Sequence, residues 1–165
     1  MTVASAGRSR TRALAAWRAV AVLLTVIGLD QLTKHTIGTS ITPGQVKTLI
    51  PGVIHLVNVR NTGVAFGVLS GGGALVYVAT GVALVSLVTY LLMRPERRLL
   101  WLPTGMLVGG AIGNLIDRAA TGSVIDFIKL PHWPAFNVAD ISITFGVIIL
   151  VLVLEFSGRS GDGGV

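Results

Sequence analysis

The chain has 165 residues, of which 52% are hydrophobic and 12% charged, and its mean hydropathy is +0.79. This composition is typical of an integral membrane protein with one domain, because a soluble domain needs more charged residues on its surface. The formal net charge of +6 does not indicate a nucleic-acid partner, since the basic residues cluster beside apolar runs. The chain has no cysteine, which excludes disulfides, thiolate nucleophiles and cysteine-ligated metals.

Four apolar runs predict membrane-spanning helices, because about 20 residues of helix cross the hydrocarbon core of a bilayer. In chain order they extend from about Ala13 to Leu29, Ala74 to Met93, Leu99 to Ile116 and Ile141 to Phe156. The first run has the basic start of a signal peptide, but no small-residue cleavage pattern follows it, which favours a retained anchor. We therefore expect an all-α membrane domain with a basic segment over residues 1–12, four spans over residues 13–156 and a disordered tail over residues 157–165.

Clusters of arginine predict how these spans are oriented. Four arginines precede the first run or lie near its start, and three fill the connection between the second and the third: Arg8, Arg10, Arg12, Arg18, Arg94, Arg97 and Arg98. Such clusters stay in the cytoplasm. Both termini are therefore expected in the cytoplasm, and the connections over residues 30–73 and 117–140 on the opposite, extracytoplasmic side.

The first outer connection carries signals for β-structure and turns. Runs rich in β-branched residues, Val46 to Leu49 and Val53 to Val59, flank Pro51-Gly52, which predicts a hairpin or small sheet over the helix ends. A turn at Asn61-Thr62-Gly63, an apolar run from Val64 to Leu69 and a flexible joint at Gly71-Gly72-Gly73 are expected to follow.

Two further patterns concern packing and the membrane surface. In the third span, Gly105, Gly109 and Gly113 recur every four residues, which predicts the close approach of another helix. In the second outer connection, Trp133 lies between His132 and Pro134 and suits the lipid headgroup zone.

Asp30 and Lys34 are four residues apart, so on a helix they share one face and can pair. One interpretation is an interfacial ion pair that orients the first span. The other is a role in a functional site, where Lys34 would hold a carbonyl or a phosphate. The spacing leaves both open.

Asn114 and Arg118 repeat this spacing at the outer end of the third span, and Asp117 adjoins Arg118. The pattern alone predicts an ion pair at a helix end. Arg118 also offers a planar fork that can clamp a carboxylate or a phosphate.

Asp126 and Asp140 are the strongest candidates for catalysis. Asp126 interrupts the apolar segment from Val124 to Ile128, and a solvated loop would not need such a run of apolar residues. Asp140 lies where the fourth helix is expected to begin. Alone, Asp140 would be interpreted as a helix cap. Two carboxyl groups brought together cannot easily both ionise, so one keeps a proton while the other acts as a base. This arrangement suits amide hydrolysis.

Other chemistries find less support in the sequence. The chain has no His-Glu-x-x-His motif and no Gly-x-Ser-x-Gly motif, which disfavours zinc and serine peptidases. His35 and His132 are expected at the interface and His55 on an exposed strand. A Ser40–Lys47 dyad stays open but has no motif around it. A small transporter that relays protons is the alternative from another class, although its acids should be spread through the spans.

Five blocks of polar residues resemble those of the bacterial lipoprotein signal peptidases (signal peptidase II). They are DQLTK at 30–34, NTGVAFG at 61–67, GGAIGNLIDR at 109–118, VIDF at 124–127 and FNVAD at 136–140. The resemblance covers about residues 14–156, and Val64 stands where the family often has alanine. It implies four transmembrane helices with a small extracytoplasmic β-cradle, in the bacterial cytoplasmic (inner) membrane.

The resemblance also implies a metal-independent aspartic endopeptidase that needs no cofactor, with Asp126 and Asp140 as its catalytic dyad. Positions that match the family's supporting residues are Asp30, Lys34, Asn61, Gly110, Asn114, Arg118, Asn137 and Ala139. The implied substrate is a prolipoprotein whose lipobox cysteine bears diacylglycerol, cut just before that cysteine. Asn114 and Asn137 are expected to hold the substrate backbone, and Arg118 to anchor the dyad region or a headgroup. Membrane lipids are the other expected partners, and a monomer is the expected state.

Overall fold

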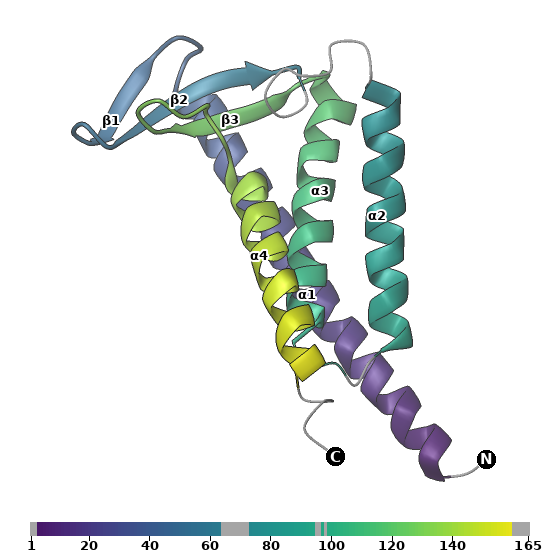
Figure 1. Cartoon of the computed structure of the whole chain (residues 1–165). Coiled ribbons are helices and arrows are strands. Elements are labelled where there is room, and N and C mark those ends of the chain that lie inside the picture. Colours follow the sequence, from purple (N-terminus) through teal and green to yellow (C-terminus); the bar gives the residue numbers. More distant parts are fainter. Residues whose placement is uncertain (1–2, 64–72, 95–96, 98, 160–165) are drawn as a thin grey trace.

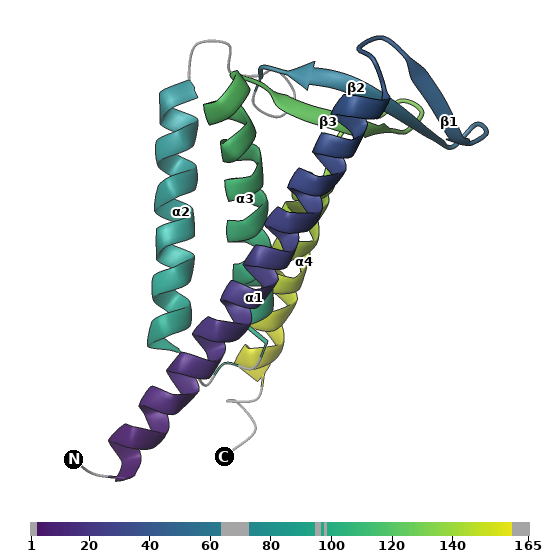
Figure 2. The ribbon, with the colours of Figure 1, turned by 180° about the vertical axis from the view of Figure 1, so that it is seen from behind.

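The structure is a computed structural model that describes residues 3–63, 73–94, 97 and 99–159. These residues form four helices and one three-stranded sheet. The helices are α1 (Val3–Ser40), α2 (Gly73–Met93), α3 (Trp101–Thr121) and α4 (Val138–Arg159), and the strands are β1 (Val46–Ile50), β2 (Ile54–Asn61) and β3 (Val124–Lys129). The sheet lies across one end of the helices, and the first residues of α1 and the last of α4 lie at the other end (Figures 1 and 2).

Each of the four predicted apolar runs forms a helix, but not every helix is long and apolar enough to pass as a membrane span. Among the described residues, two segments meet that criterion, Ser9–Ser40 in α1 and Val138–Phe156 in α4, and Thr80–Met93 in α2 is a shorter apolar helix. The presence of the helices is therefore confirmed, while the number of spans stays a prediction.

Helix α1 is much longer than the predicted first span, which ended at Leu29. Asp30 and Lys34 lie inside this helix instead of at its end. Hydropathy placed the end of this helix too early because a charged residue lowers the hydropathy of a segment even where an oppositely charged residue nearby stabilises it in the folded protein. The helix ends at Ser40, shortly before Pro43-Gly44, where Gly44 has a φ of +88°.

Two other predictions concern residues near the ends of helices. α4 continues to Arg159, so the predicted disordered tail is wrong for residues 157–159, and residues 160–165 lie outside the described part. Gly73 starts α2 and is not part of a joint. The predicted apolar run over residues 64–69 and the rest of the joint, residues 71–72, also lie outside the described residues.

The sheet has the order β1-β2-β3, and both pairs of strands are antiparallel. The hairpin of β1 and β2 around Pro51-Gly52 is confirmed. Strand β3 was not predicted, although its β-branched and aromatic residues between Gly122 and Pro131 are typical of a strand. Phe127 of β3 packs with Ile37 of α1 and with Ile41, which directly follows α1, and this apolar cluster fixes the sheet to the end of the long helix.

Glycines bring α3 close to two neighbouring helices, which confirms the predicted close approach. A Cβ atom added at Gly105 would lie 2.5 Å from the carbonyl oxygen of Ala19 in α1. A Cβ atom at Gly110, on the face toward α4, would lie 2.6 Å from the carbonyl oxygen of Ala139. These backbone contacts leave no room for any larger residue.

The Gly110→Ala substitution is expected to lower the free energy of unfolding by about 1–3 kcal/mol, because the new methyl group meets backbone that cannot rotate away. Gly81→Ala in α2 is the matched control, since nothing lies within 4 Å of a Cβ atom there. Thermal unfolding of both variants in one detergent measures the difference. Equal midpoints would contradict the close approach of α3 and α4.

Candidate active site

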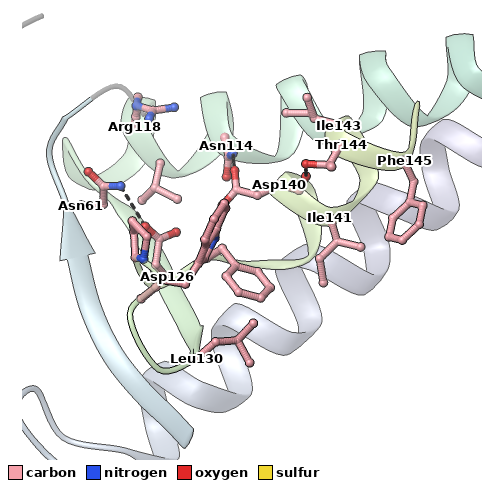
Figure 3. Close-up of a pocket in the computed structure, with 15 residues that line it drawn as sticks. Asn61, Asn114, Arg118, Asp126, Leu130, Asp140, Ile141, Ile143, Thr144 and Phe145 are labelled. Carbon is pink, nitrogen blue, oxygen red and sulfur yellow. Dashed lines mark hydrogen bonds between the residues drawn. The ribbon is translucent and has the colours of Figure 1, made fainter. Parts of the chain in front are cut away.

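One pocket of about 510 Å³ receives both of the aspartates that the sequence pairs. Asp126 points into it from β3 and Asp140 from the first turn of α4, while Asn114 and Arg118 of α3 line the same pocket (Figure 3). The structure thus brings together two carboxyl groups that are 14 residues apart in the sequence, through the turn that joins β3 to α4.

Asp126 is held by two side-chain amides and is only 3% exposed. Asn61 Nδ2 donates to its Oδ2 at 2.8 Å, and Asn137 Nδ2 donates to its Oδ1 at 2.7 Å. Burial, helped by the nearby Asp140 charge, raises the pKa of Asp126 to about 6, against the lowering effects of the Asn61 and Asn137 hydrogen bonds and of Lys34. Asp126 is therefore able to carry a proton in mildly acidic solution.

Asp140 is part of a reciprocal cap at the start of α4. Its backbone N–H donates to Asn137 Oδ1 at 2.9 Å, and its Oδ2 accepts the N–H of Asn137 at 3.2 Å. Its other oxygen, Oδ1, accepts a hydrogen bond from Asn114 Nδ2 at 2.9 Å. The helix-cap interpretation of Asp140 is thus confirmed, and the cap is what aims the carboxylate into the pocket.

Lys34 lies at the centre of a buried polar cluster behind the pocket. Its Nζ is 2.7 Å from Asp30 Oδ2, 2.9 Å from Asp117 Oδ2 and 2.9 Å from Asn114 Oδ1. An ammonium group has three N–H donors, and these three acceptors satisfy them. With Asp30 fully buried and Lys34 2% exposed, the pair is not the exposed interfacial one that the spacing also allowed.

Asn114 links Lys34 to Asp140 in the pocket. Its Oδ1 accepts hydrogen bonds from Lys34 and, at 3.1 Å, from Asn137 Nδ2. The amide nitrogen must therefore face the other way, toward Asp140. Asn114 and Asn137 were expected to hold the substrate backbone, but in this structure both bind the aspartates.

Asp30 supports the start of α4 from another helix. Its Oδ1 accepts the backbone N–H of Ala139 at 2.9 Å, which satisfies one of the free donors at that helix end. Ala139 is fully buried, and Gly110 packs against its carbonyl oxygen. Asp30, Gly110 and Ala139 thus position α4, and with it Asp140.

Asp117 and Arg118 do not form the helix-end ion pair that their sequence predicts. Asp117 pairs with Lys34 instead and accepts the backbone N–H of Ile125 at 3.3 Å, which ties α3 to β3. Arg118 donates to the carbonyl oxygen of Gly63 at 3.1 Å, and the N–H of Gly63 donates to Asn61 Oδ1 at 2.9 Å. Arg118 therefore braces the turn that aims Asn61 at Asp126.

Gln31 is a site residue that the sequence did not single out. Its Nε2 donates to Asp117 Oδ1 at 3.0 Å, to Asp30 Oδ2 at 3.2 Å and to the carbonyl oxygen of Gly113 at 3.2 Å. Its position between Asp30 and Lys34 in the DQLTK block could have indicated a role in the site. It links the two acids that flank Lys34.

Apolar side chains form the rest of the pocket wall. Trp133 and Phe136 come from the turn before α4, and Ile141 and Phe145 from α4 itself. Trp133 is 54% exposed, in keeping with an interfacial position. Ser40 and Lys47 do not line this pocket, so the alternative dyad has no place in it.

A model of the family described as signal peptidase (SPase) II matches residues 22–156 of the chain. The lipoprotein signal peptidase of Moorella thermoacetica is 44% identical over 128 residues, 77% of this chain and 85% of that protein. The lipoprotein signal peptidase of Halothermothrix orenii is 38% identical over 141 residues, 86% and 97% of the two chains. The chain belongs to the signal peptidase II family.

The fold is also similar to that of a solved relative. A bacterial membrane enzyme whose structure was determined by the in meso method at 2.3 Å resolution is 32% identical, with a TM-score of 0.76 over 89% of this chain and 93% of that chain. The membership makes the chain an aspartic peptidase, and the resemblance of the five polar blocks is confirmed.

Proposed function

We propose that Asp126 and Asp140 are the catalytic dyad of this peptidase and that the chain removes signal peptides from prolipoproteins. The observation that carries this assignment is the meeting of the two carboxyl groups in one pocket, each fixed by amide donors. Two other acids of the described helices, Asp30 and Asp117, are engaged by Lys34.

The surroundings of the two acids favour different roles. Asp140 accepts two N–H groups, one of them at a helix N-terminus, which suits a carboxylate that takes a proton from water. The oxygen of that water attacks the scissile carbonyl carbon. Protonated Asp126 donates a hydrogen bond to the developing oxyanion and then passes its proton to the leaving amine as the C–N bond breaks.

The proposal extends to the substrate and to the membrane setting. The apolar wall of the pocket along α4, with Ile141 and Phe145, suits a signal peptide and lipid chains. The resemblance to the family implies cleavage just before a cysteine that bears diacylglycerol, and we assign that position here. The four helices would span the bacterial cytoplasmic membrane, with both termini in the cytoplasm. The sheet and the dyad would then lie on the extracytoplasmic side, where water reaches the acids.

Purified protein offered matched precursors tests this function. A precursor with a lipidated cysteine should be cut, and the mass of the product should place the new N-terminus at that cysteine. The same precursor without lipid should be cut much more slowly. Equal cleavage of both would refute the lipid requirement, and loss of activity in EDTA would contradict a metal-independent mechanism.

The pH profile should reflect the proton on Asp126. Because its pKa is about 6, the protonated form is lost above that pH, and kcat/KM should fall about tenfold per pH unit. Asn61→Ala removes a donor that stabilises the charged form, so the pKa rises and the fall should begin at higher pH.

Asn58→Ala is the matched control for this profile. Asn58 lies on the same strand, but its amide donates to the carbonyl oxygen of Ile41 at 2.7 Å and not to an acid. The pH at which kcat/KM begins to fall should not move in this variant. A shift to lower pH in Asn61→Ala would contradict the role of Asp126 as the acid.

A further inference from the structure

The end of the helices away from the sheet carries an excess of positive charge that the dyad does not use (Figures 1 and 2). Its segments contain the arginines Arg8, Arg10, Arg12, Arg18, Arg94, Arg97, Arg98 and Arg159, against the acidic residues Glu96, Glu155 and Asp162. Of these acids, Glu155 of α4 is the one within the described residues. This charge favours an anionic partner at this end of the molecule.

A small apolar cluster holds the helices together here. Ala19 of α1, Leu91 of α2 and Leu100, which directly precedes α3, belong to it. The link between α2 and α3 therefore lies against α1. Arg18 and Trp101 each adjoin a member of the cluster in the sequence, and this packing brings the two side chains together.

Arg18 is held in place without the use of its hydrogen-bond donors. Its Cζ lies 5.7 Å from the centroid of the Trp101 ring, which is a cation–π contact. Within the described part of the chain, no hydrogen bond or ion pair engages the five N–H donors of its guanidinium group. Trp101 thus positions an exposed planar fork that suits the oxygens of a phosphate.

Arg97 and the start of α3 add positive charge beside this fork. The carbonyl oxygen of Arg97 accepts the N–H of Leu100 at 3.4 Å, so Arg97 lies within about one turn of the ring that Arg18 covers. Leu100, at the N-cap of α3, gives the helix no side-chain cap, and the first turn has no acidic residue. The partial positive charge of this helix end is therefore not offset by the helix itself.

The depth of Arg18 in the proposed membrane setting distinguishes it from Arg10 and Arg12. Arg18 is 16 residues before Lys34 in α1, roughly 24 Å at about 1.5 Å per residue. Because the hydrocarbon core is about 30 Å thick, Arg18 would lie near its inner edge, while Arg10 and Arg12 reach further into water. A cation at that edge is stabilised by an anionic headgroup that reaches it.

An exposed apolar face of α1 continues from Arg18 toward the centre of the bilayer. Trp17, Val20 and Leu24 follow one another at spacings of three and four residues, so they share a face of the helix. They are 72%, 40% and 61% exposed. Trp17 is of the type found at headgroup depth, and the other two suit acyl chains.

We propose that Arg18 and Arg97 bind the phosphate of an anionic lipid in the leaflet at this end of the helices, with its acyl chains along the face of Trp17, Val20 and Leu24. A zwitterionic lipid offsets its phosphate with its own ammonium group, so an anionic lipid is preferred. The inference rests on the membrane setting of the proposed function but not on the dyad.

Fluorescence of the tryptophans at this end tests the proposal. The chain has three tryptophans, and a Trp133→Phe background leaves Trp17 and Trp101. This protein is placed in bilayers of phosphatidylcholine with a minor share of phosphatidylglycerol, and one lipid or the other carries bromine on its chains. Brominated phosphatidylglycerol should quench well beyond its share of the bilayer, with a preference of about fivefold per arginine.

Variants of the two arginines should remove this preference in steps. Arg18→Gln should lower it about fivefold, and Arg18→Gln with Arg97→Gln should bring it close to one. The comparison of two brominated lipids within one variant cancels any change in the emission of Trp101 itself. Arg60→Gln is the matched control, because Arg60 is exposed on β2 at the other end of the molecule, and it should keep the full preference.

Each contrary result has its own meaning. Quenching in proportion to the share of each lipid, or a preference that persists in Arg18→Gln, would overturn the inference. If an excess of inorganic phosphate restores the fluorescence, the site takes any phosphate and the assignment to a lipid is wrong. Quenching by neither lipid would show that this end lies outside a bilayer, and the inference would fail together with the membrane setting.

Precursor cleavage is a separate readout. Arg18→Gln should cut a lipidated precursor at the wild-type rate, which also shows that the variant is folded. If the wild-type protein cuts no precursor, the proposed peptidase function fails, while the lipid preference is still decided by the quenching.

Discussion

Replacing Asp126 or Asp140 by asparagine is expected to lower the rate of precursor cleavage by about a thousandfold, the scale of a lost general acid or base. Asparagine has the same shape but neither takes a proton from water nor gives one to the leaving amine. Both variants should still bind precursor, because the apolar wall of the pocket is untouched. Single-turnover cleavage of a lipidated precursor measures the effect.

Folding provides the control for these two variants. Asp126→Asn leaves one of two amide donors, Asn61 or Asn137, facing another donor, at a cost of about 1–3 kcal/mol. The unfolding midpoint should therefore fall only modestly while the rate collapses. A variant that loses its activity only in proportion to its folded fraction would point to a structural role for that aspartate.

Lys34→Met is expected to have the largest effect on stability, about 3–5 kcal/mol, because it leaves buried charges without their counterion. Lys34 is 2% exposed, and it pairs with both Asp30 and Asp117 on two different helices. It also orients Asn114, so the cleavage rate of the remaining folded protein should fall as well. Thermal unfolding in one detergent, with the exposed Lys47→Met as control, measures the loss.

A second change separates charge balance from lost packing. Adding Asp117→Asn to Lys34→Met removes one of the two unpaired negative charges, so the double variant should be more stable than Lys34→Met alone. A double variant that is less stable, by the sum of the two single effects, would show that Lys34 does not act through Asp117. Equal stability of Lys34→Met and the wild-type protein would contradict the ion-pair cluster altogether.

Long-range polar contacts mark the limit of what this sequence predicts. Apolar runs locate all four helices, and the β-branched runs around Pro51-Gly52 locate the hairpin. The end of α1 was misplaced because the buried pair of Asp30 and Lys34 is stabilised by polar residues of α3, about 80 positions away in the sequence. The predicted partner of Asp117, Arg118, was wrong for the same reason, because the neighbouring position of Arg118 in the sequence does not reveal that Lys34 of α1 lies beside Asp117.

The sequence predicted the residues of the candidate site but not the hydrogen bonds and ion pairs that connect them. Asp126 and Asp140 emerged from their places in the sequence, and the five polar blocks supplied the supporting positions. Strand β3 was missed because an aspartate interrupts its apolar run, yet that strand is what holds Asp126 beside Asn61. How Lys34, Asn114 and Asn137 link the two acids required the structure.

The most direct test of the central claim, that Asp126 and Asp140 act as one catalytic unit, is the single-turnover rate of the double variant Asp126→Asn/Asp140→Asn. Groups that act together are not additive, so removing both should cost no more than removing either one. We therefore expect the double variant to cut a lipidated precursor at the same residual rate as each single variant. Losses that multiply in the double variant, or a single variant that keeps the wild-type rate, would contradict the dyad.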